Sequence, residues 1–165
     1  MAGQITRWIM IFEDRIEIKS SAESVFDWLV EHMKDSESYR KWHPEHVTME
    51  WIKGEPMKEG SIAYNEEYLE KHLQKLKFKF TKIVPNELIE YRVLFPLSII
   101  APGNKFIIEP TGENSCVLIA TGKINMSEKL FLKSHKEHAA KMKNTKRHMK
   151  EEGENIKKAL EKKGK

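Results

Sequence analysis

The chain has 165 residues, of which 39% are hydrophobic and 33% are charged. This length is ordinary for one domain with its own core, so we expect a single domain over residues 1–165. The formal net charge is +4, but most of the basic excess follows Lys129 and is interleaved with glutamates. That pattern is typical of a solvated helix face, and no recognised nucleic-acid-reading motif is present. We therefore expect no nucleic-acid partner.

The sequence also argues against export and against a membrane partner. Residues 1–12 lack the basic flank and long apolar stretch of a signal peptide, and no apolar run is long enough to span a bilayer. The one cysteine, Cys116, cannot form an internal disulfide and lies in an apolar run. These features predict a cytoplasmic protein in which Cys116 packs in the core.

The N-terminal part of the chain predicts a strand followed by a helix. Residues 6–19 carry apolar side chains at even spacing, as in a long strand at the edge of a sheet. Ser20 and Glu23 then fit a capping box, in which each side chain satisfies a free backbone N–H at a helix start. An apolar stripe at helical period continues this helix to Met33.

The middle of the chain reads as one short helix, over 36–41, and then as strands separated by turn residues. We expect strands near 47–53, 61–69, 73–84, 87–95, 104–110 and 115–124. With the first strand these make seven, and their hairpin-length connections indicate an antiparallel sheet. Strands followed by one long helix predict an α+β fold, in which a curved sheet grips a C-terminal helix around an interior cavity.

That last helix is expected over about 134–162, with a possible capping box at Ser134 and Glu137. Its apolar stripe is thin and consists chiefly of Met142, Met149, Ile156 and Leu160. The same face is shared or bordered by His138, Thr145, His148 and Glu152. A helix on a dry core would show a broader apolar face, so this one is expected to cover a partly polar cavity.

Three polar motifs stand out as candidates for chemistry. His148 and Glu152 lie four residues apart on one helix face and could share a metal, although a local polar contact would give the same spacing. The segment 42–46, Trp-His-Pro-Glu-His, holds two histidines beside a tryptophan that anchors it and a proline that stiffens it. The alternative is a buried turn with exposed histidines. Glu66 and Glu67 are adjacent in a strand, so one of them points inward if the pairing is regular.

The choice between the two glutamates is left open by the residues themselves. Alternation with Ile62, Tyr64 and Tyr68 turns Glu66 inward, and a bulge would reverse the choice. Both carboxylates could also face solvent on a curved sheet.

Across nearly the whole chain, the order of helix pair, strand hairpins and terminal helix resembles the START-related, pollen-allergen-like superfamily, also called SRPBCC. The resemblance implies the helix-grip fold. Within the superfamily, residues 42–46, Glu66-Glu67 and 148–156 are similar to the motifs of the diacetylphloroglucinol hydrolase branch. That branch holds zinc with histidine, glutamate, histidine and glutamate in this chain order. The resemblance thus implies the metal ligands His43, Glu67, His148 and Glu152.

The resemblance also implies an activity, the hydrolysis of a carbon-carbon bond beside a ketone with the metal as Lewis acid. His46 would lie near the substrate, and His46, Tyr64 or Tyr91 could relay protons. The chain is shorter than the characterised hydrolases and lacks their extra N-terminal region. The resemblance therefore supports the metal site more directly than it supports an acylphenol-like substrate.

Several alternatives stay open at this point. Two histidines and two carboxylates suit zinc, yet iron or manganese is chemically tolerable. The second function is that of a non-catalytic carrier of a small hydrophobic ligand, with the polar residues merely lining the cavity. A third is an interaction module that uses the basic terminal helix. A homodimer is compatible with each function.

Overall fold

The computed structural model describes residues 7–99, 101–127, 133 and 135–162. Its strands are β1 (Arg7–Ile18), β2 (His46–Lys53), β3 (Ile62–Leu69), β4 (His72–Val84), β5 (Leu88–Val93), β6 (Gly103–Gly112) and β7 (Ser115–Ser127). Its helices are α1 (Ala22–His32), α2 (Ser36–Trp42), the short 3-10 helix η1 (Leu97–Ile99) and α4 (His135–Lys162). The seven-stranded sheet and the long C-terminal helix confirm the predicted α+β helix-grip fold.

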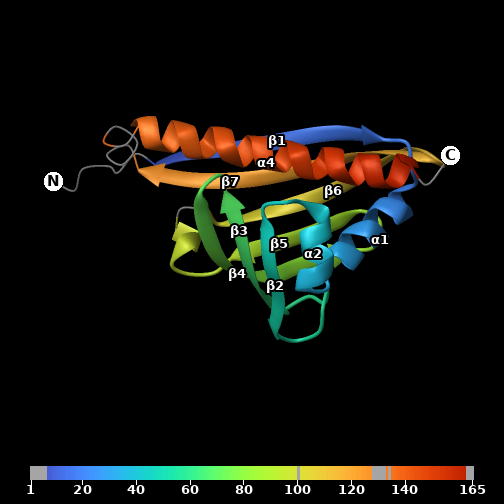
Figure 1. Ribbon diagram of the computed structural model, residues 1–165, viewed down its shortest axis with the longest axis horizontal. Helices are drawn as coiled ribbons and strands as arrows, with labels where there is room; N and C mark the ends of the chain where they lie inside the picture. Colours follow the sequence, from blue (N-terminus) through green and yellow to red (C-terminus); the bar gives the residue numbers. More distant parts are fainter. Residues whose placement is uncertain (1–6, 100, 128–132, 134, 163–165) are drawn as a thin grey trace.

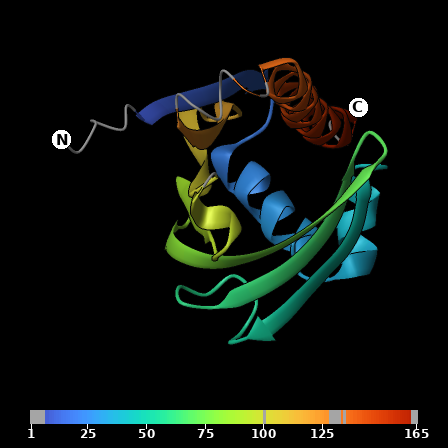
Figure 2. The ribbon, with the colours of Figure 1, turned by 90° about the vertical axis from the view of Figure 1, so that its left-hand side faces the viewer.

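The sheet is antiparallel throughout, with the strand order β1-β7-β6-β5-β4-β3-β2. Because β1 ends this order, the predicted edge position of the first strand is confirmed. The sheet curves around α1, while α4 runs along β1 and β7 at one side of the curve (Figures 1 and 2). A Cβ at Gly153 of α4 would lie 3.2 Å from Ile16 Cγ2, so a glycine lets this helix approach β1 closely.

The first helix begins one residue later than its predicted capping box. Ser21 is the N-cap, and its Oγ accepts a hydrogen bond from the backbone N–H of Ser24 at 3.2 Å. Ser24 therefore takes the position in the box that the prediction assigned to Glu23. The second predicted box, at Ser134 and Glu137, lies outside the residues whose side chains the structure describes, as does His138.

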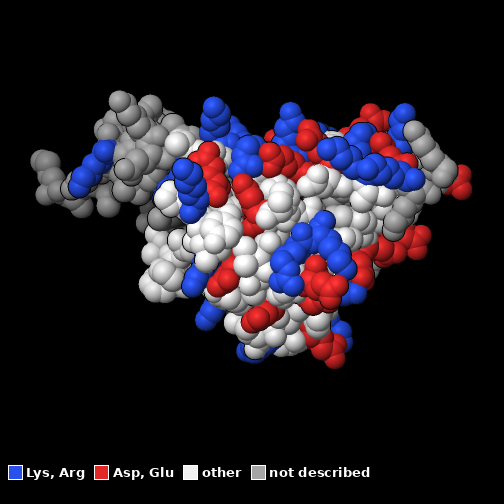
Figure 3. Space-filling model, viewed as in Figure 1, with Lys and Arg blue, Asp and Glu red and all other residues white. Residues whose placement is uncertain are grey.

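The core lies inside the curved sheet, and Cys116 is fully buried in it, which confirms its predicted packing role. Acidic side chains are interspersed with lysine and arginine along α4, as expected of a solvated helix face (Figure 3). Within the described part of the chain, no helix combines the length and hydropathy needed to cross a membrane.

Candidate functional site

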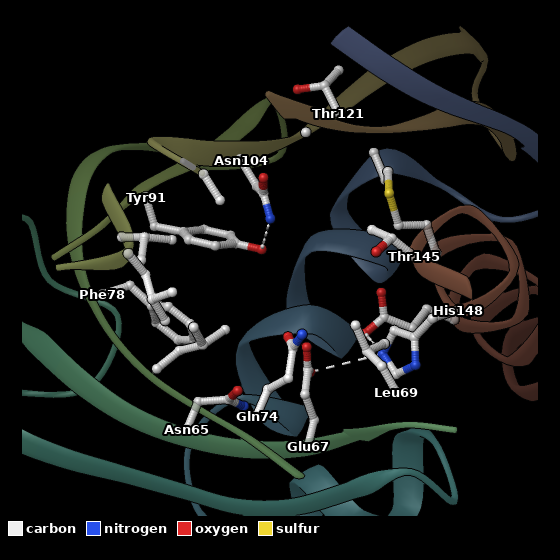
Figure 4. Close-up of a pocket in the computed structure, with 18 of the residues that line it drawn as sticks. Asn65, Glu67, Leu69, Gln74, Phe78, Tyr91, Asn104, Thr121, Thr145 and His148 are labelled. Atoms are coloured by element: carbon white, nitrogen blue, oxygen red, sulfur yellow. Dashed lines mark hydrogen bonds and ion pairs between the residues drawn. The ribbon is translucent and has the colours of Figure 1, made fainter. Parts of the chain in front are cut away.

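A cavity of about 530 Å³ lies between the concave face of the sheet and α4. Its wall is mainly aromatic and aliphatic, and its polar side chains include Asn65, Glu67, Gln74, Tyr91, Asn104, Thr121, Thr145 and His148 (Figure 4). The helix α4 contributes Met142, Thr145, His148, Met149 and Glu152. The prediction that this thin apolar face covers a partly polar cavity is confirmed. Its size suits a small organic ligand.

His46 is held rigidly at the start of β2. It is 3% exposed, and its ring stacks on Tyr39 with the centroids 3.8 Å apart and the planes inclined by 4°. Its Nδ1 lies 3.0 Å from the backbone carbonyl of Tyr39. Since a carbonyl only accepts hydrogen bonds, Nδ1 carries a proton, and Nε2 is directed toward α4, where it lies 2.9 Å from Glu152 Oε1.

Glu67 reaches the same place from the neighbouring strand. It is the direct cross-strand partner of His46 in the antiparallel pairing of β2 and β3, so the two side chains lie on one face of the sheet. The Tyr39 hydroxyl donates a hydrogen bond to Glu67 Oε2 at 2.8 Å. One aromatic side chain thus orients both the histidine and the carboxylate.

Glu66 faces the other way, which corrects the prediction made from simple alternation. Its carboxylate accepts hydrogen bonds from Tyr64 and Thr48. The inner face of β3 instead carries the buried Ala63 and Asn65. Strand alternation holds in β3, but the prediction took Tyr64 as an inward residue, and this large aromatic lies outside.

His148 and Glu152 project from α4 toward the two sheet residues, as their four-residue spacing predicts. The Nε2 atoms of His46 and His148 are 3.3 Å apart. Glu152 Oε1 lies 2.9 Å from His46 Nε2 and 3.3 Å from His148 Nε2. Glu67 Oε2 lies 4.0 Å from His46 Nε2 and 3.8 Å from His148 Nε2. We call these four residues the donor cluster.

The donor cluster fits a small divalent cation. Four ligands at zinc distances in a tetrahedron are roughly 3.3 Å from one another, and the five separations above run from 2.9 to 4.0 Å. Imidazole nitrogen and carboxylate oxygen are donors that zinc accepts. His46, Glu67, His148 and Glu152 could hold such an ion, and His43, His46 and His148 are a second set that could.

His43 lies beside the cluster, but its nitrogens are engaged elsewhere. Its potential ligand atom is within 4.8 Å of those of His46 and His148. However, its Nδ1 accepts a hydrogen bond from the backbone N–H of Glu45 at 3.0 Å, and its Nε2 lies 2.9 Å from Glu151 Oε2. His43, His46 and His148 form a triad that could hold a metal, so the predicted ligand role of His43 stays a prediction, while these hydrogen bonds favour His46 in its place. The extended backbone of His43 before Pro44 gives the ring this orientation.

Tyr64 and Tyr91, the two tyrosines predicted as proton relays, lie on different sides of the sheet. Tyr64 donates to Glu66 on the outer face of β3, away from the cavity, so its position does not support a proton-relay role. Tyr91 points into the cavity from the wall opposite His148 (Figure 4), and its hydroxyl oxygen accepts a hydrogen bond from Asn104 at 3.4 Å. Burial raises the pKa of Tyr91, which keeps this hydroxyl neutral and able to donate.

The charges of the donor cluster are strongly coupled. Burial alone would lower the pKa of His148, but its carboxylate neighbours, Glu152 first, raise it to about 10. Burial alone would raise the pKa of Glu152, yet His148 and His46 hold it at about 2. Without a bound cation, a proton between the two rings therefore offsets part of the carboxylate charge.

The sequence predictions missed three contributors to this site. Tyr39 orients two members of the donor cluster, Glu45 contacts His148 Nδ1, and Arg147 contacts Glu45. Each acts through a contact between distant segments. Only Glu45 had a sequence signal, its place inside the predicted motif 42–46.

Residues 10–161 match the family model described as polyketide cyclase/dehydrase and lipid transport. The chain belongs to this family. A comparison with curated proteins found no match. The family assignment agrees with the cavity, because both point to a protein that takes up a small hydrophobic ligand.

Several solved structures share the fold at low sequence identity. An aromatase/cyclase from Streptomyces has a TM-score of 0.77 at 11% identity, over 96% of this chain and 97% of that one. A point mutant of norcoclaurine synthase from Thalictrum flavum has a TM-score of 0.70 at 14%, over 98% and 100%. A START superfamily protein from Mycobacterium smegmatis has a TM-score of 0.68 at 15%, over 92% and 97%. These structures agree with the predicted helix-grip fold, while the hydrolase branch stays a prediction.

Proposed function

We propose that this protein is a metal-dependent hydrolase that cleaves a carbon-carbon bond beside a ketone in its cavity. One observation carries the proposal. The Nε2 atoms of His46 and His148 face each other at 3.3 Å, while the Nδ1 atoms of both rings lie against fixed acceptors. Once the proton shared between the two rings is lost, two lone pairs and two carboxylates converge on one buried point, an arrangement that suits a divalent cation.

In the zinc-free protein, the proton held by His148 offsets part of the charge of the cluster's carboxylates. In the ion pairs formed by the described residues, neither Glu67 nor Glu152 is paired with a lysine or arginine. The side chains of these two glutamates are only 18% and 13% exposed. A divalent ion, zinc first by donor type, would displace that proton and neutralise the two carboxylates.

A bound cation would supply Lewis acidity to a ketone oxygen. In the proposed reaction, the oxygen of water bonds to the acyl carbon, the bond from that carbon to its neighbour breaks, and the leaving carbon takes a proton. The chain's own residues bind and orient the substrate. The aromatic and aliphatic wall holds an apolar body, and Tyr91 with Asn104 offers hydrogen bonds opposite the donor cluster. This arrangement favours an aryl ketone that carries a hydroxyl, an acylphenol-like substrate.

Metal analysis tests the proposal. We expect the purified protein to bind about one zinc ion per chain, and we expect His148→Ala and Glu152→Ala each to lose it, because each variant removes one of four ligands. His72→Ala is the matched control, since His72 is exposed at the start of β4. Chelation should abolish hydrolysis of an acylphenol, and added zinc should restore it.

The carrier function predicts a different result in the same experiment. A folded wild-type protein that binds no zinc when zinc is supplied, yet takes up an apolar ligand, would contradict the hydrolase proposal. The apolar wall of the cavity would then account for the binding.

Tyr91 gives a test of substrate orientation. Tyr91→Phe should weaken the binding of a hydroxylated acetophenone about 5- to 10-fold, the effect of one lost hydrogen bond, and should leave plain acetophenone unchanged. Calorimetric titration measures both affinities. Tyr64→Phe is the control because its hydroxyl lies outside the cavity. Equal losses for the two acetophenones would show that Tyr91 only shapes the wall.

A further inference from the structure

The carboxylate of Glu45 makes a short contact with the donor cluster although it is not one of its members. Glu45 Oε2 lies 2.7 Å from His148 Nδ1, the ring nitrogen that faces away from the cluster. The His148 side chain is 6% exposed and that of Glu45 is 19% exposed, so water screens this contact only weakly. The carboxylate accepts the Nδ1 proton in a hydrogen bond and thereby directs the Nε2 atom toward the other donors.

Glu45 is itself held in place by a bracket of charged residues. Arg147 donates to Glu45 Oε1 at 2.8 Å through Nη2 and to Glu151 Oε2 at 2.6 Å through Nη1. Glu151 in turn contacts His43 Nε2, and His43 Nδ1 accepts the backbone N–H of Glu45. The contacts form a closed ring that joins the loop before β2 to α4. The buried His43 is thereby accounted for as part of this bracket.

The two histidines of the donor cluster are oriented by different means. His46 is hydrogen-bonded through Nδ1 to the backbone carbonyl of Tyr39, which a side-chain substitution does not remove. His148 is hydrogen-bonded through Nδ1 to the side chain of Glu45. His148 also projects from α4, a helix that must dock correctly against the sheet. The geometry of the cluster is therefore most sensitive to this one carboxylate.

We propose that Glu45 is a positioning residue for the metal site: it orients His148 so that the four donors can bind one ion. This inference rests on the proposed function, because the ion belongs to that function. It adds a residue that makes no contact with substrate or metal. Outer hydrogen bonds of this kind typically change metal affinity 10- to 100-fold.

The test compares Glu45→Gln with Glu151→Gln. Both variants remove one carboxylate that contacts Arg147, but only the first removes the charged partner of His148 Nδ1. Zinc affinity is measured by competition with a chromophoric chelator. We expect Glu45→Gln to bind zinc about 10- to 100-fold more weakly than wild type, and Glu151→Gln to change by less than about 3-fold. Circular dichroism shows whether each variant keeps its fold.

A second measurement does not depend on metal. In zinc-free protein, the His148 Nδ1 proton should give a slowly exchanging, downfield proton resonance, because it is hydrogen-bonded to a buried carboxylate. Glu45→Gln should shift this resonance upfield or remove it, and Glu151→Gln should keep it. If wild type binds no zinc, the metal-dependent function fails, and the resonance still decides whether Glu45 orients His148.

Three results would overturn the inference. The first is an unchanged resonance in Glu45→Gln. The second is zinc binding by Glu45→Gln at wild-type affinity. The third is an equal loss of zinc affinity in both variants, which would assign the effect to the charge of the whole bracket and not to the contact with His148.

Discussion

Replacing His46 by alanine should remove zinc binding, while replacing His43 by alanine should largely preserve it. The two histidines are three residues apart in the same motif and are both buried, at 3% and 2% exposure. Only His46 directs a free nitrogen into the donor cluster, whereas His43 uses its two nitrogens on Glu45 and Glu151. We expect His46→Ala to weaken zinc binding by at least about 100-fold and His43→Ala by less than about 10-fold.

Chelator competition and metal content after dialysis measure this difference. His43→Ala also leaves the Glu151 carboxylate and a backbone N–H with one partner fewer, so it should lower the free energy of unfolding by about 1–3 kcal/mol. Thermal unfolding of the zinc-free proteins separates that effect from metal loss. The reverse ranking, with His43→Ala losing zinc and His46→Ala keeping it, would reinstate His43 as the ligand.

The second large effect is expected at Glu67. Glu67→Gln keeps the size and shape of the side chain but removes a charge from the cluster, so zinc affinity should fall by about 100-fold and acylphenol hydrolysis should fall with it. Glu66→Gln, one residue earlier on the outer face of β3, should leave both quantities unchanged. The pair tests which face of the strand carries the chemistry.

The effect of Glu67→Gln on stability should differ between the zinc-free and the zinc-bound protein. Without zinc, the change removes one of two carboxylates that converge on the buried histidines, and an amide oxygen can still accept the hydrogen bond from Tyr39. The zinc-free variant should therefore be at least as stable as wild type. Zinc should raise the melting temperature of wild type and of Glu66→Gln, and much less that of Glu67→Gln. A clear loss of stability without zinc would instead assign Glu67 a structural role.

The sequence by itself determined the features that depend on neighbouring residues. Even spacing of apolar residues predicted the strands, and their hairpin-length connections predicted an antiparallel sheet. The four-residue spacing on α4 placed His148 and Glu152 on one face, because helix geometry is local. The thin apolar stripe of the same helix predicted a partly polar cavity beneath it. The resemblance supplied the expectation of zinc.

Only the tertiary structure decided which side chains converge. Alternation tells that Glu66 and Glu67 lie on opposite faces, but packing of the whole sheet determines which face is inner. The choice between His43 and His46 depended on the turn at Pro44 and on Glu151, which is more than a hundred residues away in the sequence. Tyr39 and Glu45 gained their roles in the same way, through contacts across the fold. Local periodicity sets the direction of a side chain relative to its own element, and docking of the elements sets what that side chain meets.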